Sequence, residues 1–185
     1  MKNPFTTIDK WSTWRNLVLM IVISAVSVIM MGFLTQTLVY DVYGEASMPD
    51  TQFTYTYDEI LEAFNILGAQ GLQIWSQVHL LDTIFPIGYS FALVFGLGLG
   101  LRATYPEKET LRVLTLFPLI AALFDYLENA LIASQIGVYP NLSIEVIAIS
   151  SVVTSIKWIL LYSTFAVVFI LMIIWIIQKI AIQLK

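Results

Sequence analysis

Four long runs of apolar residues alternate with shorter polar stretches along the chain. They occupy residues 15–39, 75–101, 111–134 and 150–177. A transmembrane helix needs about 20 mainly apolar residues, so each run is long enough to cross a membrane. The pattern therefore predicts an all-α, polytopic membrane four-helix bundle that forms a single domain over residues 1–185.

A further helix is expected between the first two runs, over residues 57–68. Thr56 and Glu59 have the spacing of a capping box, in which each side chain bonds the other residue's backbone N–H. Apolar positions then recur at helical spacing as far as Gly68, with three acids on the opposite side. We expect a short amphipathic helix that lies over the outer mouth of the bundle, as a lid or as a lead-in to the second span.

Composition narrows the class of protein. Of the 185 residues, 58% are hydrophobic and only 12% are charged, which leaves too little polar surface for a soluble globule. The absence of cysteine excludes disulfides, thiol catalysis and cysteine-ligated metal centres. A net charge of −4 with dispersed basic residues argues against nucleic acid as a partner. No motif indicates a cofactor.

The distribution of lysine and arginine predicts the topology. The polar segments over residues 41–74 and 135–149 contain neither residue. The N-terminal end and the middle loop contain both, and the C-terminal end contains Lys179 and Lys185. Cytoplasmic loops carry an excess of lysine and arginine. We therefore expect both termini in the cytoplasm, with the first and third loops outside.

Four charged residues lie well inside the predicted spans, away from their ends: Asp82, Asp125, Glu128 and Lys157. Charged groups are costly in hydrocarbon and usually face a bundle interior or a cavity. The rise of an α-helix places all four at a common depth in the outer half of the bundle. Pro86 cannot donate a hydrogen bond to the carbonyl of Asp82, which predicts a kink at that acid.

These residues and their neighbours on the same helical faces predict a ligand-binding pocket. The leading hypothesis is that it binds a lipid headgroup or a small amphiphile from the membrane. Lys157 would pair with an anionic group, while Asp82 and Glu128 would accept hydrogen bonds or balance a cationic one. The predicted ligand-binding residues are Asp82, Tyr89, Asp125, Glu128, Asn129, Lys157, Trp158 and Tyr162.

The charges in this set do not balance. Three acids outnumber the one lysine, and uncompensated buried carboxylates do not stay ionised. Protonated acids, a protonated His79 one turn before Asp82, or a bound cation would each supply the compensation.

Three other functions fit the same residues. An intramembrane enzyme would use Asp82, Asp125 and Glu128 as catalytic acids and bases, or hold a metal ion with these three and His79. A proton or cation pathway would favour an oligomer, because four helices leave limited room for a wide pore. A structural accessory subunit would use the charges only to fix helix register, and Gly96-x-x-x-Gly100 predicts close helix packing.

Two motifs carry a resemblance to a known group of proteins. They are Asp82-x-x-Phe85-Pro86-x-x-Tyr89 and Asp125-x-x-Glu128-Asn129, with Lys157 in the last span. Over residues 55–162 the chain resembles an uncharacterised group of small prokaryotic four-helix integral membrane proteins. The resemblance implies only that these residues belong to one shared polar centre, and it implies no catalytic roles. The expected location is a prokaryotic cytoplasmic membrane.

Overall fold

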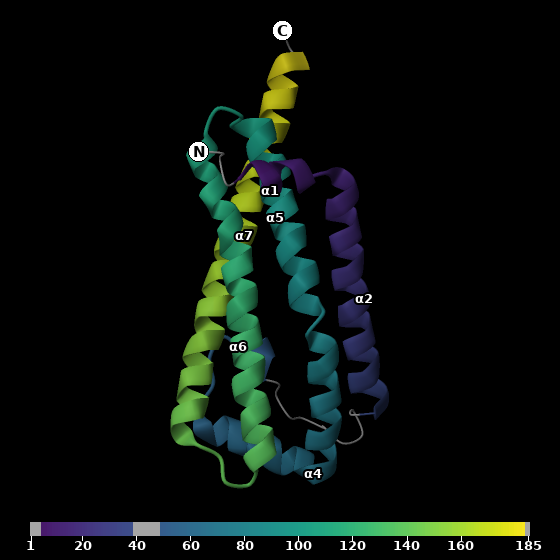
Figure 1. Ribbon diagram of the computed structural model, residues 1–185, viewed down its shortest axis with the longest axis vertical. Helices are drawn as coiled ribbons and strands as arrows, with labels where there is room; N and C mark the ends of the chain where they lie inside the picture. Colours follow the sequence, from purple (N-terminus) through teal and green to yellow (C-terminus); the bar gives the residue numbers. More distant parts are fainter. Residues whose placement is uncertain (1–4, 39–48, 184–185) are drawn as a thin grey trace.

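Helices are the only regular elements in the part of the chain that the computed structural model describes, residues 5–38 and 49–183. Figure 1 shows how they are arranged. In chain order they are α1 (Thr6–Trp11), α2 (Trp14–Leu38), η1 (Pro49–Thr51), α4 (Tyr57–Asp82), α5 (Phe85–Thr104), η2 (Glu109–Leu116), α6 (Phe117–Val138) and α7 (Ile144–Gln183).

Four helical stretches are long and apolar enough to cross a membrane: Trp14–Phe33, Tyr57–Thr104, Glu109–Val138 and Ile144–Gln183. The predicted all-α class and its four apolar stretches are therefore confirmed. The end of the first predicted run, residue 39, lies outside the described residues. Helix α7 has 40 residues and begins well before the predicted residue 150. It starts early because the Ser143 hydroxyl accepts the Val146 N–H and caps the first turn.

The second apolar run is not one continuous helix. Helix α4 ends at Asp82 and α5 begins at Phe85, with Pro86 in its first turn, where a missing N–H costs nothing. The predicted kink at Asp82 is confirmed. It interrupts the helix at Thr83 and Ile84, whose backbone dihedrals stay in the right-handed helical region. The Tyr126 hydroxyl of α6 donates to the Thr83 carbonyl at 2.7 Å and satisfies one acceptor at the break.

Helix α4 changes direction at Gly68, whose φ of 59° and ψ of −175° are not helical. A positive φ favours glycine because glycine has no Cβ. The predicted capping box of Thr56 and Glu59 starts the helix. Figure 1 shows the first half of α4 running across one end of the bundle, which we call the α4 end. There Ile60 and Phe64 are fully buried, and the Phe64 ring packs edge-on against Trp75.

Helix α5 is the central helix of the bundle. Helix α2 packs mainly on one side of it, and α6 and α7 pack on the other (Figure 1). At Gly88 the two backbones are so close that a Cβ would lie 2.9 Å from the Ser24 nitrogen. The opposite end of the bundle contains α1, and we call it the α1 end. There Arg102 donates to the carbonyls of Asp9 at 2.8 Å and Ser12 at 2.7 Å.

The glycines of Gly96-x-x-x-Gly100 differ in their surroundings. A Cβ at Gly100 would lie 3.3 Å from Leu171 Cβ, so this glycine packs closely against α7 as predicted. A Cβ at Gly96 would meet only Leu17 Cδ1, at 3.9 Å. The space beside Gly96 is therefore open enough to admit a side chain.

The distribution of polarity is inverted relative to a water-soluble protein. Ile29 and Phe33 of α2 are 68% and 66% exposed, whereas Glu128 of α6 is 1% exposed. Monomeric soluble proteins rarely expose apolar surface on this scale. The apolar exterior is suited to contact with lipid.

Gly88→Leu is expected to destabilise the fold by about 1–3 kcal/mol, because the added side chain has to push α2 away from α5. Gly32→Leu is the matched control, since nothing lies within 4 Å of a Cβ at Gly32. Unfolding of both variants in detergent measures the difference. Equal stability of the two variants would contradict the close approach at Ser24.

Candidate functional site

Lys157 of α7 lies between two acids of α6. Its Nζ donates to Glu128 Oε2 and lies 3.6 Å from Asp125 Oδ1. The three side chains are almost completely buried. Positions 125 and 128 are one turn apart, which places both carboxylates on the face of α6 that meets α7.

Hydrogen bonds extend this ion pair to two further segments. Thr154 donates to Glu128 Oε1 at 2.6 Å, and the Tyr55 hydroxyl lies 3.1 Å from Thr154 Oγ1. On the other side, the Tyr89 hydroxyl donates to Asp125 Oδ2 at 2.9 Å. The segment before α4 and helices α5, α6 and α7 are therefore joined through one set of polar side chains, here the charged centre.

Asp82 lies at the end of α4 and is 7% exposed. Asn129 of α6 donates to its Oδ2 at 2.7 Å. This bond connects the helix break to the same face of α6 that carries Asp125 and Glu128. Asp82, the third predicted acid, is therefore linked to the α6 face of the charged centre by the side-chain amide of Asn129.

His79 is predicted either to compensate the acids as a cation or to help hold a metal ion. Its Nδ1 is buried with no hydrogen-bond partner, and its ring packs beside Trp75 at 5.5 Å. Within the described residues no ion pair joins His79 to Asp82. Nor, among those residues, does any group of three or more His, Asp and Glu side chains have the arrangement to hold a metal ion. The predicted metal set of His79, Asp82, Asp125 and Glu128 is not assembled.

The two aromatic residues predicted on α7 lie at different depths. Trp158 is half-buried, and the Lys157 Nζ lies 5.5 Å from the centroid of its ring, within range of a cation–π contact. Tyr162 is 57% exposed and stacks on Trp158 at 5.3 Å from the outside. The structure brings seven of the eight predicted ligand-binding residues together and leaves Tyr162 on the outer surface.

The charged residues pack against one another, and an open space lies beside them. A cavity of about 640 Å³ is formed between α2, α5 and α7, and of the predicted residues it contains only Tyr89. A second cavity of about 480 Å³ adjoins it toward the α1 end. Leu17, Gly96 and Val168 line both, so the two are sections of one groove, here the lateral groove.

Tyr89 connects the lateral groove to the charged centre. Its side chain lines the groove, while its hydroxyl bonds Asp125 behind it. The lateral groove is otherwise apolar apart from Ser24 and, at the opposite end, Arg102. The open space is therefore a groove beside the charged centre and not a pocket enclosed by the charges.

Sequence reasoning missed the contribution of α2. This helix carries no charge after its first turn, so nothing in it pointed to a site. The side chains that face the groove do recur at helical spacing, and that spacing was the available signal. They are Leu17, Ile21, Ser24, Ala25, Val28 and Ile29.

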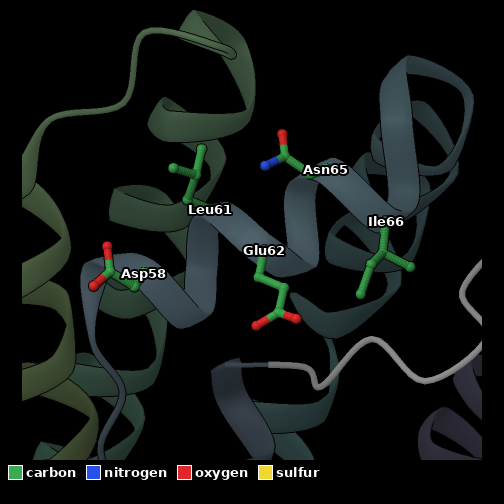
Figure 2. A pocket seen from close by; sticks show the side chains of 5 residues that line it. All are labelled: Asp58, Leu61, Glu62, Asn65 and Ile66. Atoms are coloured by element: carbon green, nitrogen blue, oxygen red, sulfur yellow. The ribbon is translucent and has the colours of Figure 1, made fainter.

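A third hollow, of about 430 Å³, lies on the surface beside the first half of α4. Figure 2 shows its five lining side chains, from Asp58 to Ile66, all of which belong to α4. No residue of another described element appears in its lining, so it has no opposing wall. We assign no binding role to it.

No protein-family model, curated protein or solved structure matches the chain. The function is therefore inferred from the geometry of the charged centre and the lateral groove.

Lys157→Met and Glu128→Leu are each expected to lower the free energy of unfolding by about 3–5 kcal/mol, because each leaves a partner charge buried and unpaired. The double variant is expected to recover most of this loss. Unfolding in detergent, with the two single variants as controls, measures the coupling. A double variant as unstable as the sum of the single variants would show that the two side chains act independently.

Proposed function

We propose that this chain is an integral membrane protein that binds a lipid or small amphiphile in the lateral groove. The observation that carries the proposal is the groove itself, an apolar space between α2 and α7 with α5 as its floor. Its volume lies in the range of small-molecule sites. Because its walls are helices with apolar exteriors, a ligand would reach it sideways from the membrane.

The proposed orientation places the α1 end of the bundle in the cytoplasm, with the α4 end outside. Lysine and arginine are concentrated in the segments at the α1 end and near the two termini. Trp14 and Trp175 line the groove at that same end, where an aromatic belt would lie at the membrane interface. The expected location is a prokaryotic cytoplasmic membrane.

The charged centre would hold the helices around this groove in place. It joins α6 to α7 through Lys157 and holds α5 to α6 through the Tyr89 hydroxyl. The first half of α4 covers the α4 end with the buried side chains of Ile60 and Phe64. This cover favours a side opening as the route of the ligand over an opening at that end.

Gly96→Leu is expected to reduce the amount of bound lipid several-fold, because the new side chain would project into the middle of the groove without meeting backbone. Gly32→Leu adds the same side chain at a position with no neighbours and is the control. Native mass spectrometry of each protein in mild detergent counts the retained lipid. Equal retention by both variants and the unsubstituted protein would refute the groove as the binding site.

Tyr89→Phe is expected to lower the stability of the protein without changing the amount of lipid that it binds. It removes a hydrogen bond to the buried Asp125 carboxylate, which should cost about 1–3 kcal/mol of stability, but leaves the ring in the groove wall. Retained lipid is therefore expected to be unchanged while the unfolding temperature falls. A large loss of lipid with unchanged stability would assign the hydroxyl to the ligand instead.

A further inference from the structure

We infer that the lateral groove takes an anionic glycerophospholipid, with the phosphate at Arg102 and an acyl chain directed along α5 toward Tyr89. This inference rests on the proposed function and assigns the class of ligand and its direction. The two ends of the groove carry different polar residues. Arg102 gives one end a positive charge, and Tyr89, with acids behind it, lies at the other.

Arg102 presents a fixed positive charge at one end of the groove. Its Nη1 and Nη2 donate to the carbonyls of Asp9 and Ser12, which holds the guanidinium in place. Arg102 forms no ion pair with a carboxylate of the described residues, and the carboxylate of Asp9 is bound by Arg112 instead. A guanidinium has five N–H donors, so three remain for a ligand.

This arrangement suits a phosphate. Arginine binds phosphate oxygens with two parallel hydrogen bonds, and its charge would be neutralised by the ligand rather than by the protein. Trp14 of α2 and Trp175 of α7 line the same section, at 69% and 42% exposure. Their amphipathic rings are typical of the level at which lipid headgroups lie.

The length of the groove matches an acyl chain. Arg102 and Tyr89 are 13 residues apart on α5, which corresponds to roughly 20 Å along a helix. One leaflet of a bilayer has a hydrocarbon depth of about 15 Å. A chain attached to a phosphate at Arg102 would therefore be accommodated between Arg102 and the ring of Tyr89.

The opposite end of the groove is unsuited to an anionic headgroup. The Tyr89 hydroxyl is already donated to Asp125, and Asp82 and Glu128 add further acidic groups to the same centre against one lysine. A phosphate there would face carboxylates in a medium that screens charge poorly. The difference in charge between the two ends fixes the direction of the ligand.

The test compares phosphatidylglycerol with phosphatidylcholine of identical acyl chains, added in equal amounts to the delipidated full-length protein. Native mass spectrometry measures which lipid is retained. The unsubstituted protein is expected to favour phosphatidylglycerol, and Arg102→Gln to lower that preference about tenfold, since a hydrogen bond to a charged group is lost. Arg15→Gln is the matched control, because Arg15 is exposed at the same end but does not line the groove.

Arg102 also holds α1, so a second pair of variants leaves its hydrogen bonds intact. Ala103 lines the same section of the groove and is exposed. Ala103→Glu and Ala103→Gln add nearly the same bulk to the groove and differ in charge, so Ala103→Glu is expected to lower the preference for phosphatidylglycerol well below that of Ala103→Gln. Loss of preference in the Glu variant alone supports a phosphate beside Arg102.

Two results would overturn the inference and separate it from the proposed function. Equal retention of the two lipids by the unsubstituted protein, with Gly96→Leu still reducing both, would leave the groove as a lipid site without headgroup recognition. Retention that neither Gly96→Leu nor Arg102→Gln alters would mean surface-bound lipid only, and both proposals would fail.

Discussion

A lysine buried among apolar helices needs a carboxylate beside it, and much of this structure follows from how Lys157 meets that need. Its contacts with Glu128 and Asp125 fix the rotation and the height of α7 against α6. A shift of either helix by one residue would bury separated charges, which is far more costly than a shift between apolar faces. The same acids then determine what can surround them, because their remaining oxygens require donors.

Those donors come from different helices, and packing of apolar faces alone would not set the register of these helices against one another. Thr154 and Tyr89 supply hydroxyls to the two acids of α6, and Asn129 supplies an amide to Asp82 at the helix break. Each bond specifies one neighbour and one register. In a membrane, where apolar faces are nearly equivalent to lipid, such polar contacts are the main source of specificity between helices.

The sequence revealed the parts of this fold that depend on local pattern. The four apolar stretches, the capping box before α4 and the interruption caused by Pro86 each depend on a few consecutive residues. The gathering of Asp125, Glu128 and Lys157 followed from depth and from the cost of charge in hydrocarbon.

Other features could not be predicted, because the sequence pattern carries no information about which residues become neighbours. Tyr162 lies five residues after Lys157, which is about 140° around the helix, so it points away from the charged centre. Helix α2 is apolar on nearly every face, and such a sequence does not indicate which face meets α5. Tyr55 reaches Ser150 across 95 residues of chain, a pairing that no local pattern predicts.

The attachment of α2 has a mechanical consequence for the groove. Close contacts hold the chain to α5 just before α2 begins, where Ser12 lies against Gly98, and again within α2, where Ser24 lies against Gly88. Gly96 lies between these two contacts along α5 and has no side chain that could contact α2. Beside Gly96 the lateral groove lies between α2 and α5. The width of the groove beside Gly96 is therefore set by contacts on either side of that residue, at Gly88 and at Gly98, and not by Gly96 itself.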